Sequence, residues 1–265
     1  CLGLPPLGVS FTIATPRKYK KYDLDEDSLT LSRQRVEQEL MASAGRIVAF
    51  SPHERDAMVS LYGADPSHVE LVPCGVDLSL FRPLDRQEAR ERLGLNGGKV
   101  VLYVGRLEPL KGLELLLQTA AQLETCQDVR VLVVGGAAGA EEEVHRMQDL
   151  ARDLNVEDVF DFVGRVNQDE LPWYYNAADI CVVPSYYESF RLAALESMAC
   201  GTPTLGTDIG SNTEIIGEFD PRLLIPEATP EGISKTVLSA FDLCASDDRI
   251  RTRCRQYVEE RFNWD

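Results

Sequence analysis

The sequence has 265 residues, of which 44% are hydrophobic and 26% are charged, and its formal net charge is -16. This composition is typical of a globular protein with one large or two modest domains. The acidic balance excludes nucleic acid and anionic membranes as default partners, because both would repel the chain. No apolar run approaches the roughly 18 residues of a membrane-spanning helix, and no N-terminal stretch has the regions of a signal peptide.

The seven cysteines include no C-x-x-C pair, and Cys181 lies within an apolar run. This usage is typical of a reducing compartment, so we expect a cytoplasmic protein. The three histidines lie far apart and have no partner at metal-ligand spacing, which favours loop or surface roles over a metal site. The chain begins at Cys1 rather than Met, which we interpret as either processing or a fragment.

The first part of the chain predicts alternating strands and helices. A β-branched apolar run predicts a strand at residues 8–14, and helical periodicity predicts a helix at residues 29–44. Arg33 and Glu37 lie one turn apart in that helix, where they can form an ordinary surface ion pair.

Two more strands and a capped helix follow. Residues 46–50 and 69–72 predict strands. Between them, Ser51 predicts a helix start, because Pro52 takes the first helical position and Glu54 lies three residues after the cap. The composition changes near residues 75–85, which predicts a domain boundary there. We therefore expect two domains, at residues 1–80 and 81–265.

From residue 99 onward strands and helices alternate regularly. The predicted strands lie at residues 100–104, 129–134, 159–163, 179–183, 203–206 and 223–225. The predicted helices lie at residues 112–123, 141–154, 169–177, 190–199, near 213, 230–243 and 248–261. Near-continuous apolar strands that alternate with helices predict an α/β fold with a parallel sheet covered on both faces. In such sheets ligands bind at the carboxyl ends of the strands.

The first strand of this alternation ends in a glycine and two cations. Gly105 would let a ligand approach the backbone closely, and Arg106 and Lys111 follow it at the mouth of the next helix. The two cations can neutralise a diphosphate, Arg by bidentate bonding and Lys as a point charge. The alternative is that they are surface charges paired with Glu108 and Glu114.

Two carboxylates, Glu188 and Glu196, bracket the start of the helix predicted at residues 190–199. A helix N-terminus presents free N–H groups and a partial positive charge, so it can seat a phosphate. If helical, the stretch between the two acids spans about 12 Å, roughly the length of a sugar nucleotide. The alternative is an ordinary strand–helix unit with one N-terminal acid and one surface acid.

Several common site motifs are absent from the sequence. There is no G-x-x-x-x-G-K-[ST] phosphate loop, no G-x-G-x-x-G after the first strand and no G-x-S-x-G elbow. These absences argue against an ATPase, an ordinary nicotinamide dehydrogenase and a serine hydrolase. The cation pair, the two acids and the glycines at strand ends 135–136 and 164 together predict a sugar-nucleotide site, since cations suit phosphates and carboxylates suit sugar hydroxyls.

Five longer motifs occur together in the second part of the chain. They are Val-Gly-Arg-Leu-Glu-Pro-Leu-Lys-Gly at 104–112, Phe-Val-Gly-Arg at 162–165, Tyr-Asn-Ala-Ala-Asp at 175–179, Pro-Ser-Tyr-Tyr-Glu-Ser-Phe at 184–190 and Leu-Glu-Ser-Met-Ala-Cys-Gly-Thr-Pro at 195–203. In this combination the chain resembles the retaining family-4 glycosyltransferases of the GT-B fold, over about residues 9–265. The likeness is greatest to the sucrose-synthase and inositol-phosphate glycosyltransferase branch.

The resemblance implies a role for each candidate residue. Arg106 and Lys111 would hold the donor diphosphate and stabilise the leaving nucleoside diphosphate, and Glu188 would bind the donor sugar. These three are the catalytic candidates, and neither a metal nor another cofactor would be required. The donor-binding candidates are Glu196 at the ribose, Arg165 and Val166 at the base, and the loop residues Ser189, Phe190, Arg191 and Leu192. Gly105 is a further donor-binding candidate. On the acceptor side, Arg33 matches an arginine that can bind an acceptor phosphate.

The sequence departs from the family pattern at several places. Only the last part of the first of two GT-B domains is present, and no histidine occurs at residues 15–17, where relatives usually carry one. Arg191 stands where relatives have glycine, so its side chain can crowd the donor or its backbone can be shifted. The Gly-Gly-x-x-Glu segment is changed at residues 209–214.

The resemblance implies a retaining glycosyltransferase that moves a hexose from a UDP- or GDP-sugar to an acceptor hydroxyl. Its fold would be of GT-B type, with a complete donor-binding domain and the C-terminal part of a second domain. The alternatives are a sugar-nucleotide-binding fragment or degenerate paralogue without transfer activity, and a GT-B-like sugar-nucleotide epimerase. The expected partners are a nucleotide-sugar donor, an unknown acceptor and the missing N-terminal half of the enzyme.

Overall fold

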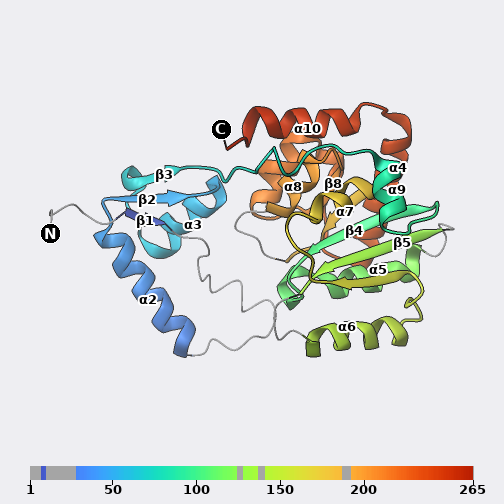
Figure 1. Ribbon diagram of the computed structural model, residues 1–265. Helices are drawn as coiled ribbons and strands as arrows, with labels where there is room; N and C mark the ends of the chain where they lie inside the picture. The colour runs from blue at the N-terminus through green and yellow to red at the C-terminus, as the bar shows by residue number, and fades with distance from the viewer. Residues whose placement is uncertain (1–6, 10–27, 124–127, 137–140, 187–191, 265) are drawn as a thin grey trace. The chain divides into compact units, whose positions relative to one another are not determined.

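The computed structural model describes residues 7–9, 28–123, 128–136, 141–186 and 192–264. It divides into two compact units, one formed by the described residues up to Cys74 and the other by those from Gly75 onward. Each unit has its own parallel sheet (Figure 1). None of the described helices has the length and apolarity needed to cross a bilayer.

The first unit is a small β-α-β-α-β arrangement. Strands β1 (Leu7–Val9), β2 (Arg46–Ala49) and β3 (Val69–Leu71) pair in parallel in that order. They are joined by helices α2 (Ser28–Ser43) and α3 (Pro52–Tyr62) and by a short 3-10 turn, η1 (Pro66–His68). The strands and helices predicted at residues 29–72 are confirmed. Of the strand predicted at residues 8–14, only residues 8 and 9 belong to the described part of the chain, and both lie in β1.

The core of the first unit is built by residues from both helices and two strands. These buried residues are Met41, Ala44, Ile47, Ala49, Met58, Tyr62, Ala64 and Val69. The predicted cap of α3 is present, because Ser51 Oγ accepts the Glu54 N–H at 3.1 Å and Glu54 Oε2 accepts the Phe50 N–H at 2.8 Å. The first bond satisfies a donor that a helix start leaves without a partner, and the second ties Glu54 to the residue before the cap.

The second unit contains a six-stranded parallel sheet in the order β6-β5-β4-β7-β8-β9. Its strands are β4 (Lys99–Gly105), β5 (Val129–Gly135), β6 (Phe160–Gly164), β7 (Ile180–Val183), β8 (Thr204–Thr207) and β9 (Leu224–Ile225). The central strands are buried along most of their length, as the apolar runs in the sequence predicted. This is the doubly wound order, in which the chain first builds outward from β4 on one side and then on the other.

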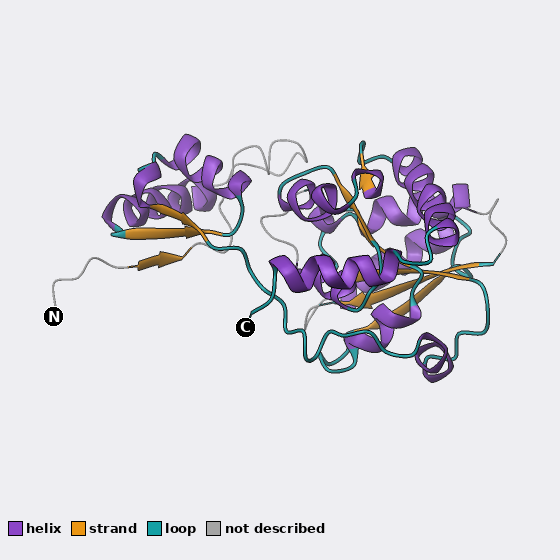
Figure 2. Ribbon diagram, turned by 90° about the horizontal axis from the view of Figure 1, so that it is seen from above, coloured by secondary structure: helices purple, strands orange, loops and turns teal. Residues whose placement is uncertain are grey.

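Helices cover both faces of this sheet. The described helices of the second unit are α4 (Arg86–Arg92), α5 (Leu113–Leu123), α6 (Glu141–Asp153), α7 (Leu171–Ala177), α8 (Leu192–Ala199), α9 (Pro230–Ser246) and α10 (Ile250–Arg261), with short turns η2 (Pro109–Lys111), η3 (Thr213–Gly217) and η4 (Pro221–Leu223). Helix α5 packs against α6 and α9, whereas α8 packs against α7 and α10. Figures 1 and 2 show the strands between these helices.

One element was not predicted. Helix α4 begins after Asp85, whose carboxylate accepts the Glu88 N–H at 2.8 Å. It packs against α7 and buries only Ala89. A single buried apolar position has no periodicity, so the pattern that predicts the other helices is missing here. The only sequence signal for this helix is its Asp-x-x-Glu cap.

Candidate functional site

The strand order of the second sheet reverses between β4 and β7, which are direct neighbours. The loops that follow these two strands both start at the carboxyl-terminal end of the sheet and lead to opposite faces of it. In open α/β sheets ligands bind in the crevice that forms at such a point. The predicted cation pair follows β4, and the predicted acidic loop comes after β7 in the sequence, so the topology brings the described residues directly after these two strands to one place.

Hydrogen bonds join the loop after β4 to the loop after β7. The Tyr186 N–H donates to the Leu110 carbonyl at 2.9 Å, and Ser185 Oγ donates to the Lys111 carbonyl at 3.4 Å. Lys111 is therefore held beside the backbone that leads into the segment carrying Glu188. The sequence predicted that these residues converge but did not show what joins them.

A glycine makes this close approach possible. Gly112 has a left-handed backbone, with φ 71°, and a Cβ on it would lie 2.0 Å from the Pro184 carbonyl oxygen. No side chain fits at that distance, and non-glycine residues rarely adopt this φ. Gly112 thus ends the η2 turn and lets helix α5 start directly against the end of β7.

Three glycines end adjacent strands at nearly the same level. Gly105 pairs with Gly135, and Gly164 pairs with Val134. Gly135 has a φ of 140°, and a Cβ there would lie 1.8 Å from the Gly105 carbonyl oxygen. All three glycines are half-buried. The strand ends therefore present backbone rather than side chains, which allows a ligand to come close.

Arg106 is paired with a neighbour along the chain. Its Nη1 lies 2.6 Å from Glu108 Oε1, and the Arg106 side chain is 63% exposed and that of Glu108 42%. This agrees with the surface-pair alternative for Arg106, whereas Glu114 contacts Arg146 at 3.4 Å. An exposed pair contributes at most about 1 kcal/mol, so it would not hold Arg106 away from a stronger anion. The Arg106 backbone is fixed, because its carbonyl accepts the Tyr103 hydroxyl at 3.0 Å.

Glu196 lies in α8 and has a buried partner. Its Oε2 accepts the hydroxyl of Tyr175, in α7, at 2.8 Å. Burial raises the pKa of the Glu196 carboxyl, and the hydrogen bond from Tyr175 opposes this rise. Burial, helped by the charge of Glu196, also raises the pKa of the fully buried Tyr175 phenol well above its ordinary value. Sequence reasoning did not single out Tyr175, whose only signal is its place in the Tyr-Asn-Ala-Ala-Asp motif.

The remaining candidates are placed as follows. Leu192 begins α8 and is exposed; Arg165 is exposed and Val166 half-buried, directly after Gly164. Arg33 belongs to the first unit, where its Nε lies 2.7 Å from Glu37 Oε1, so the predicted ion pair is confirmed. The predicted residues that lie outside the described part of the chain are Glu188, Ser189, Phe190 and Arg191.

The last residue of the Tyr-Asn-Ala-Ala-Asp motif has a structural role that the sequence did not reveal. Asp179 is buried and accepts bonds from the guanidinium groups of Arg86 and Arg90 in α4 and from the Val100 N–H at 2.8 Å. It thereby ties helix α4 to the start of β4, at the opposite end of the sheet from the candidate site.

The Asn176 side chain fixes the segment before α4. Its Oδ1 accepts the Leu84 N–H at 2.8 Å, and its Nδ2 donates to the Arg82 carbonyl at 3.1 Å. On α10, Arg255 donates to the Phe81 carbonyl at 2.6 Å. The chain that enters the second unit is thus held against both α7 and α10.

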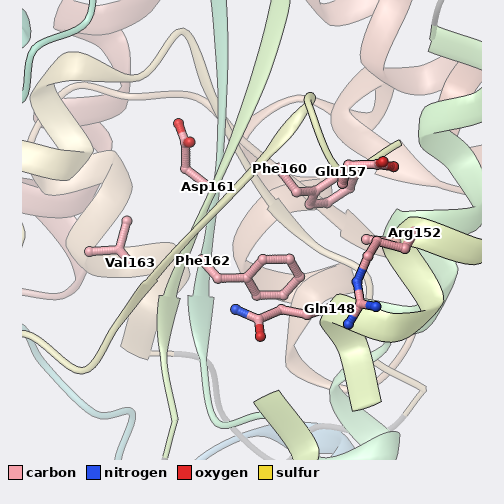
Figure 3. Close-up of a pocket in the computed structure, with 8 residues that line it drawn as sticks. Gln148, Arg152, Glu157, Phe160, Asp161, Phe162 and Val163 are labelled. Atoms are coloured by element: carbon pink, nitrogen blue, oxygen red, sulfur yellow. The ribbon is translucent and has the colours of Figure 1, made fainter. Parts of the chain in front are cut away.

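A pocket of about 400 Å³ opens between α6 and the edge strand β6. Figure 3 shows the Phe162 ring beside Gln148 and Arg152 of α6 and the Phe160 ring next to Glu157. None of the residues predicted for the donor site lines this pocket. Within the described part of the chain, no three His, Cys, Asp or Glu side chains gather as a metal ion requires.

Comparison with known proteins agrees with this arrangement. The family model "Glycosyl transferases group 1" matches residues 85–261, and "Glycosyltransferase Family 4" matches residues 7–80. The chain is 35% identical over 272 residues to a D-inositol 3-phosphate glycosyltransferase of Acidothermus cellulolyticus, covering 99% of this chain and 60% of that protein. It is 39% identical over 251 residues to D-inositol 3-phosphate glycosyltransferase 2 of Catenulispora acidiphila, covering 91% of this chain and 58% of that protein. The chain thus spans about 60% of the length of these curated relatives.

Solved structures show the same fold. Sucrose-phosphate synthase from Thermosynechococcus elongatus superposes with a TM-score of 0.83 at 30% identity, covering 97% of this chain and 64% of that one. Anabaena HepE, solved in complex with UDP-glucose, superposes with a TM-score of 0.84 at 20% identity, covering 98% of this chain and 68% of that one, which is a likeness of fold. These neighbours confirm the predicted α/β fold of GT-B type. Since the first family model covers more than half of the chain, the protein belongs to the group 1 family of glycosyl transferases.

Proposed function

We propose that the second unit binds a nucleotide-sugar donor and that the protein transfers a hexose from a UDP- or GDP-sugar to an acceptor hydroxyl with retention of configuration. The observation that carries the proposal is the joining of the loops after β4 and β7 at the point where the strand order reverses. It holds Lys111 next to the backbone of Ser185 and Tyr186, which precede Glu188 in the sequence. The family membership supports the reaction class.

The charges at this edge suit a departing diphosphate. Lys111 and Arg106 follow a strand end that presents only glycine backbone. In the proposed reaction they hold the two donor phosphates and stabilise the negative charge that develops when the bond to the sugar breaks. Fixed cations placed where charge develops stabilise a transition state without any reorganisation at the moment of reaction.

The carboxylates act on the sugar hydroxyls. Glu188 binds the hexose, and Glu196 binds the ribose of the nucleotide. The backbone from Ser189 to Leu192 would supply N–H groups to the phosphates and the sugar, and Arg165 and Val166 would line the base. On the other unit, Arg33 would contact an acceptor phosphate in exchange for its present partner Glu37. Because the relatives are longer than this chain, we propose that transfer requires sequence beyond it, whereas donor binding does not.

We further propose that donor binding needs no metal, because two cationic side chains already offset the diphosphate charge. Titrating the protein with UDP should give the same dissociation constant with EDTA as with added Mg²⁺. A loss of affinity in EDTA that Mg²⁺ restores would contradict this part of the proposal.

Calorimetric titration with UDP, GDP and their sugars tests the donor assignment. The expected result is saturable binding of a uridine or guanosine diphosphate, weakened by raised salt because the contacts are ionic. If neither nucleotide binds, the site assignment is wrong. If UDP or GDP binds, but a form of the protein as long as its curated relatives shows neither transfer nor donor hydrolysis, the protein is a sugar-nucleotide-binding module instead.

A further inference from the structure

The Glu196 side chain has one defined partner in the second unit. The Tyr175 hydroxyl donates to Oε2 at 2.8 Å, and no described residue bonds to Oε1. An ionised carboxylate can accept about four hydrogen bonds, so after the tyrosine bond most of its capacity remains for a ligand. The partners lie in different helices, α7 and α8, and 21 positions apart along the chain.

Tyr175 is enclosed by contacts from several elements. Its side chain is fully buried, and its ring meets that of Phe81 edge to face, with centroids 6.0 Å apart and planes at 70°. Its backbone carbonyl accepts the Thr202 hydroxyl at 2.6 Å, and Thr202 Oγ1 in turn accepts Arg251 Nη2 at 2.9 Å. The hydroxyl is therefore a fixed point held by the entering chain, by the segment after α8 and by α10.

A glutamate has three side-chain torsions, and an unrestrained carboxylate loses rotamer freedom when a ligand binds it. A rigid hydrogen-bond donor to one carboxylate oxygen restricts the rotamers before the ligand binds. Ligand binding then carries a smaller entropic cost. We propose that Tyr175 is a positioning residue that orients the Glu196 carboxylate toward the ribose hydroxyls of the donor nucleotide. This inference rests on the proposed function, because it takes Glu196 to be the ribose ligand.

A buried tyrosine can also bond to a carboxylate merely because its hydroxyl needs a partner. The two roles differ in one measurable quantity, the preference for ribose over deoxyribose. Loss of a purely structural bond would weaken all nucleotides alike or none. Loss of a positioning bond weakens the binding only of nucleotides that carry the ribose hydroxyls to which Glu196 bonds.

The experiment measures the affinities of UDP, 2′-deoxy-UDP and 3′-deoxy-UDP by calorimetry for the wild-type chain and for Tyr175→Phe. In the wild type at least one deoxy analogue should bind about tenfold more weakly than UDP. In Tyr175→Phe the UDP affinity should fall about tenfold, while the affinity of that analogue should change little. The ratio between the two nucleotides should therefore approach one.

A matched control is Tyr103→Phe, which also removes a buried hydroxyl in the same unit. The Tyr103 hydroxyl donates to the Arg106 carbonyl at 3.0 Å, near the proposed phosphate site and not at Glu196. Its removal should change the affinities of UDP and the deoxy analogues by the same factor. Thermal unfolding of both variants checks that they are folded.

A double-mutant cycle with Glu196→Gln tests whether the two residues act together. If Tyr175 acts through Glu196, the ratio of UDP affinity to deoxy-UDP affinity should be the same in the double variant as in Glu196→Gln alone. An unchanged ribose preference in Tyr175→Phe, with UDP still binding, would overturn the inference and leave the proposed function standing. Absence of UDP and GDP binding in the wild type would overturn the proposed function, and the inference with it.

Discussion

At the scale of single residues, contacts close in sequence could be predicted and distant ones could not. The Arg33–Glu37 pair and the Ser51–Glu54 cap follow from helix geometry alone, and both are present. The Tyr175–Glu196 and Asp179–Arg86 contacts depend on how helices pack, which no local pattern encodes. The roles proposed for Arg106 and Lys111 rest on residue chemistry, and the position of these two residues follows from the order of the strands.

Glu54 gives a pH-dependent prediction for the first unit. Its side chain is buried, its Oε1 has no hydrogen-bond partner among the described residues, and burial raises its pKa from 4.5 to about 6 despite the bond from the Phe50 N–H. The folded state therefore holds the proton more tightly than the unfolded state. The contribution of Glu54 to the free energy of unfolding should fall by about 2 kcal/mol as the pH rises from below 4.5 to above 6.

Glu54→Gln tests this dependence, because the amide keeps an acceptor for the Phe50 N–H and cannot ionise. Hydrogen-exchange protection of the α3 amides gives the free energy of opening of this helix. The difference in this free energy, variant minus wild type, should increase by about 2 kcal/mol from pH 4 to pH 7. The prediction is wrong if the difference between the two proteins is the same at both pH values.

At the scale of elements, the strands and most helices followed from apolar runs and their periods. Strands β4, β5, β7 and β8 are buried on both faces, and such strands are near-continuous in apolar residues. Helix α4 was missed because it buries one residue and is held by ion pairs to Asp179 instead of by an apolar face. The loop contacts at the site could not be predicted either, since both are made to backbone carbonyls, which every residue carries.

Gly112 tests whether the two loops must stay joined. Gly112→Ala should lower stability and weaken UDP binding, because its Cβ would displace Pro184. The control is Gly94→Ala, since Gly94 has a similar φ of 67° and no atom within 4 Å of the added Cβ. The control should cost about 1 kcal/mol in unfolding free energy and leave UDP binding intact. Equal losses in the two variants would show that backbone strain, and not the contact between loops, decides the effect.

Asp179 tests the anchor of α4. Asp179→Ala would remove the only carboxylate partner of Arg86 and Arg90 given by the described residues and the acceptor of the Val100 N–H, at a cost of about 3 kcal/mol. Asp149→Ala, which breaks an exposed pair with Arg152, should cost about 0.5 kcal/mol or less. Urea unfolding followed by tryptophan fluorescence reports on the second unit, because Trp173 and Trp264 both lie in it. Similar losses in the two variants would contradict a buried anchor.

At the scale of the whole molecule, the sequence predicted an α/β chain, but the order of its strands came only from the structure. Alternating strands and helices are compatible with several parallel orders. The observed order reverses at β4 and β7, and this reversal alone makes those two loops meet. The described residues up to Cys74 and those from Gly75 onward form separate units, and the chain spans about 60% of the length of its curated relatives.

The central claim, that Lys111 is a phosphate ligand of a nucleotide-sugar site, is tested most directly by UDP titration of Lys111→Ala. Lys235→Ala is the matched control, because Lys235 is an exposed lysine on α9 in the same unit. Loss of one charge-assisted phosphate contact predicts an affinity about 10- to 100-fold weaker for Lys111→Ala, and the wild-type affinity for Lys235→Ala. UDP binding that Lys111→Ala leaves unchanged would contradict the account.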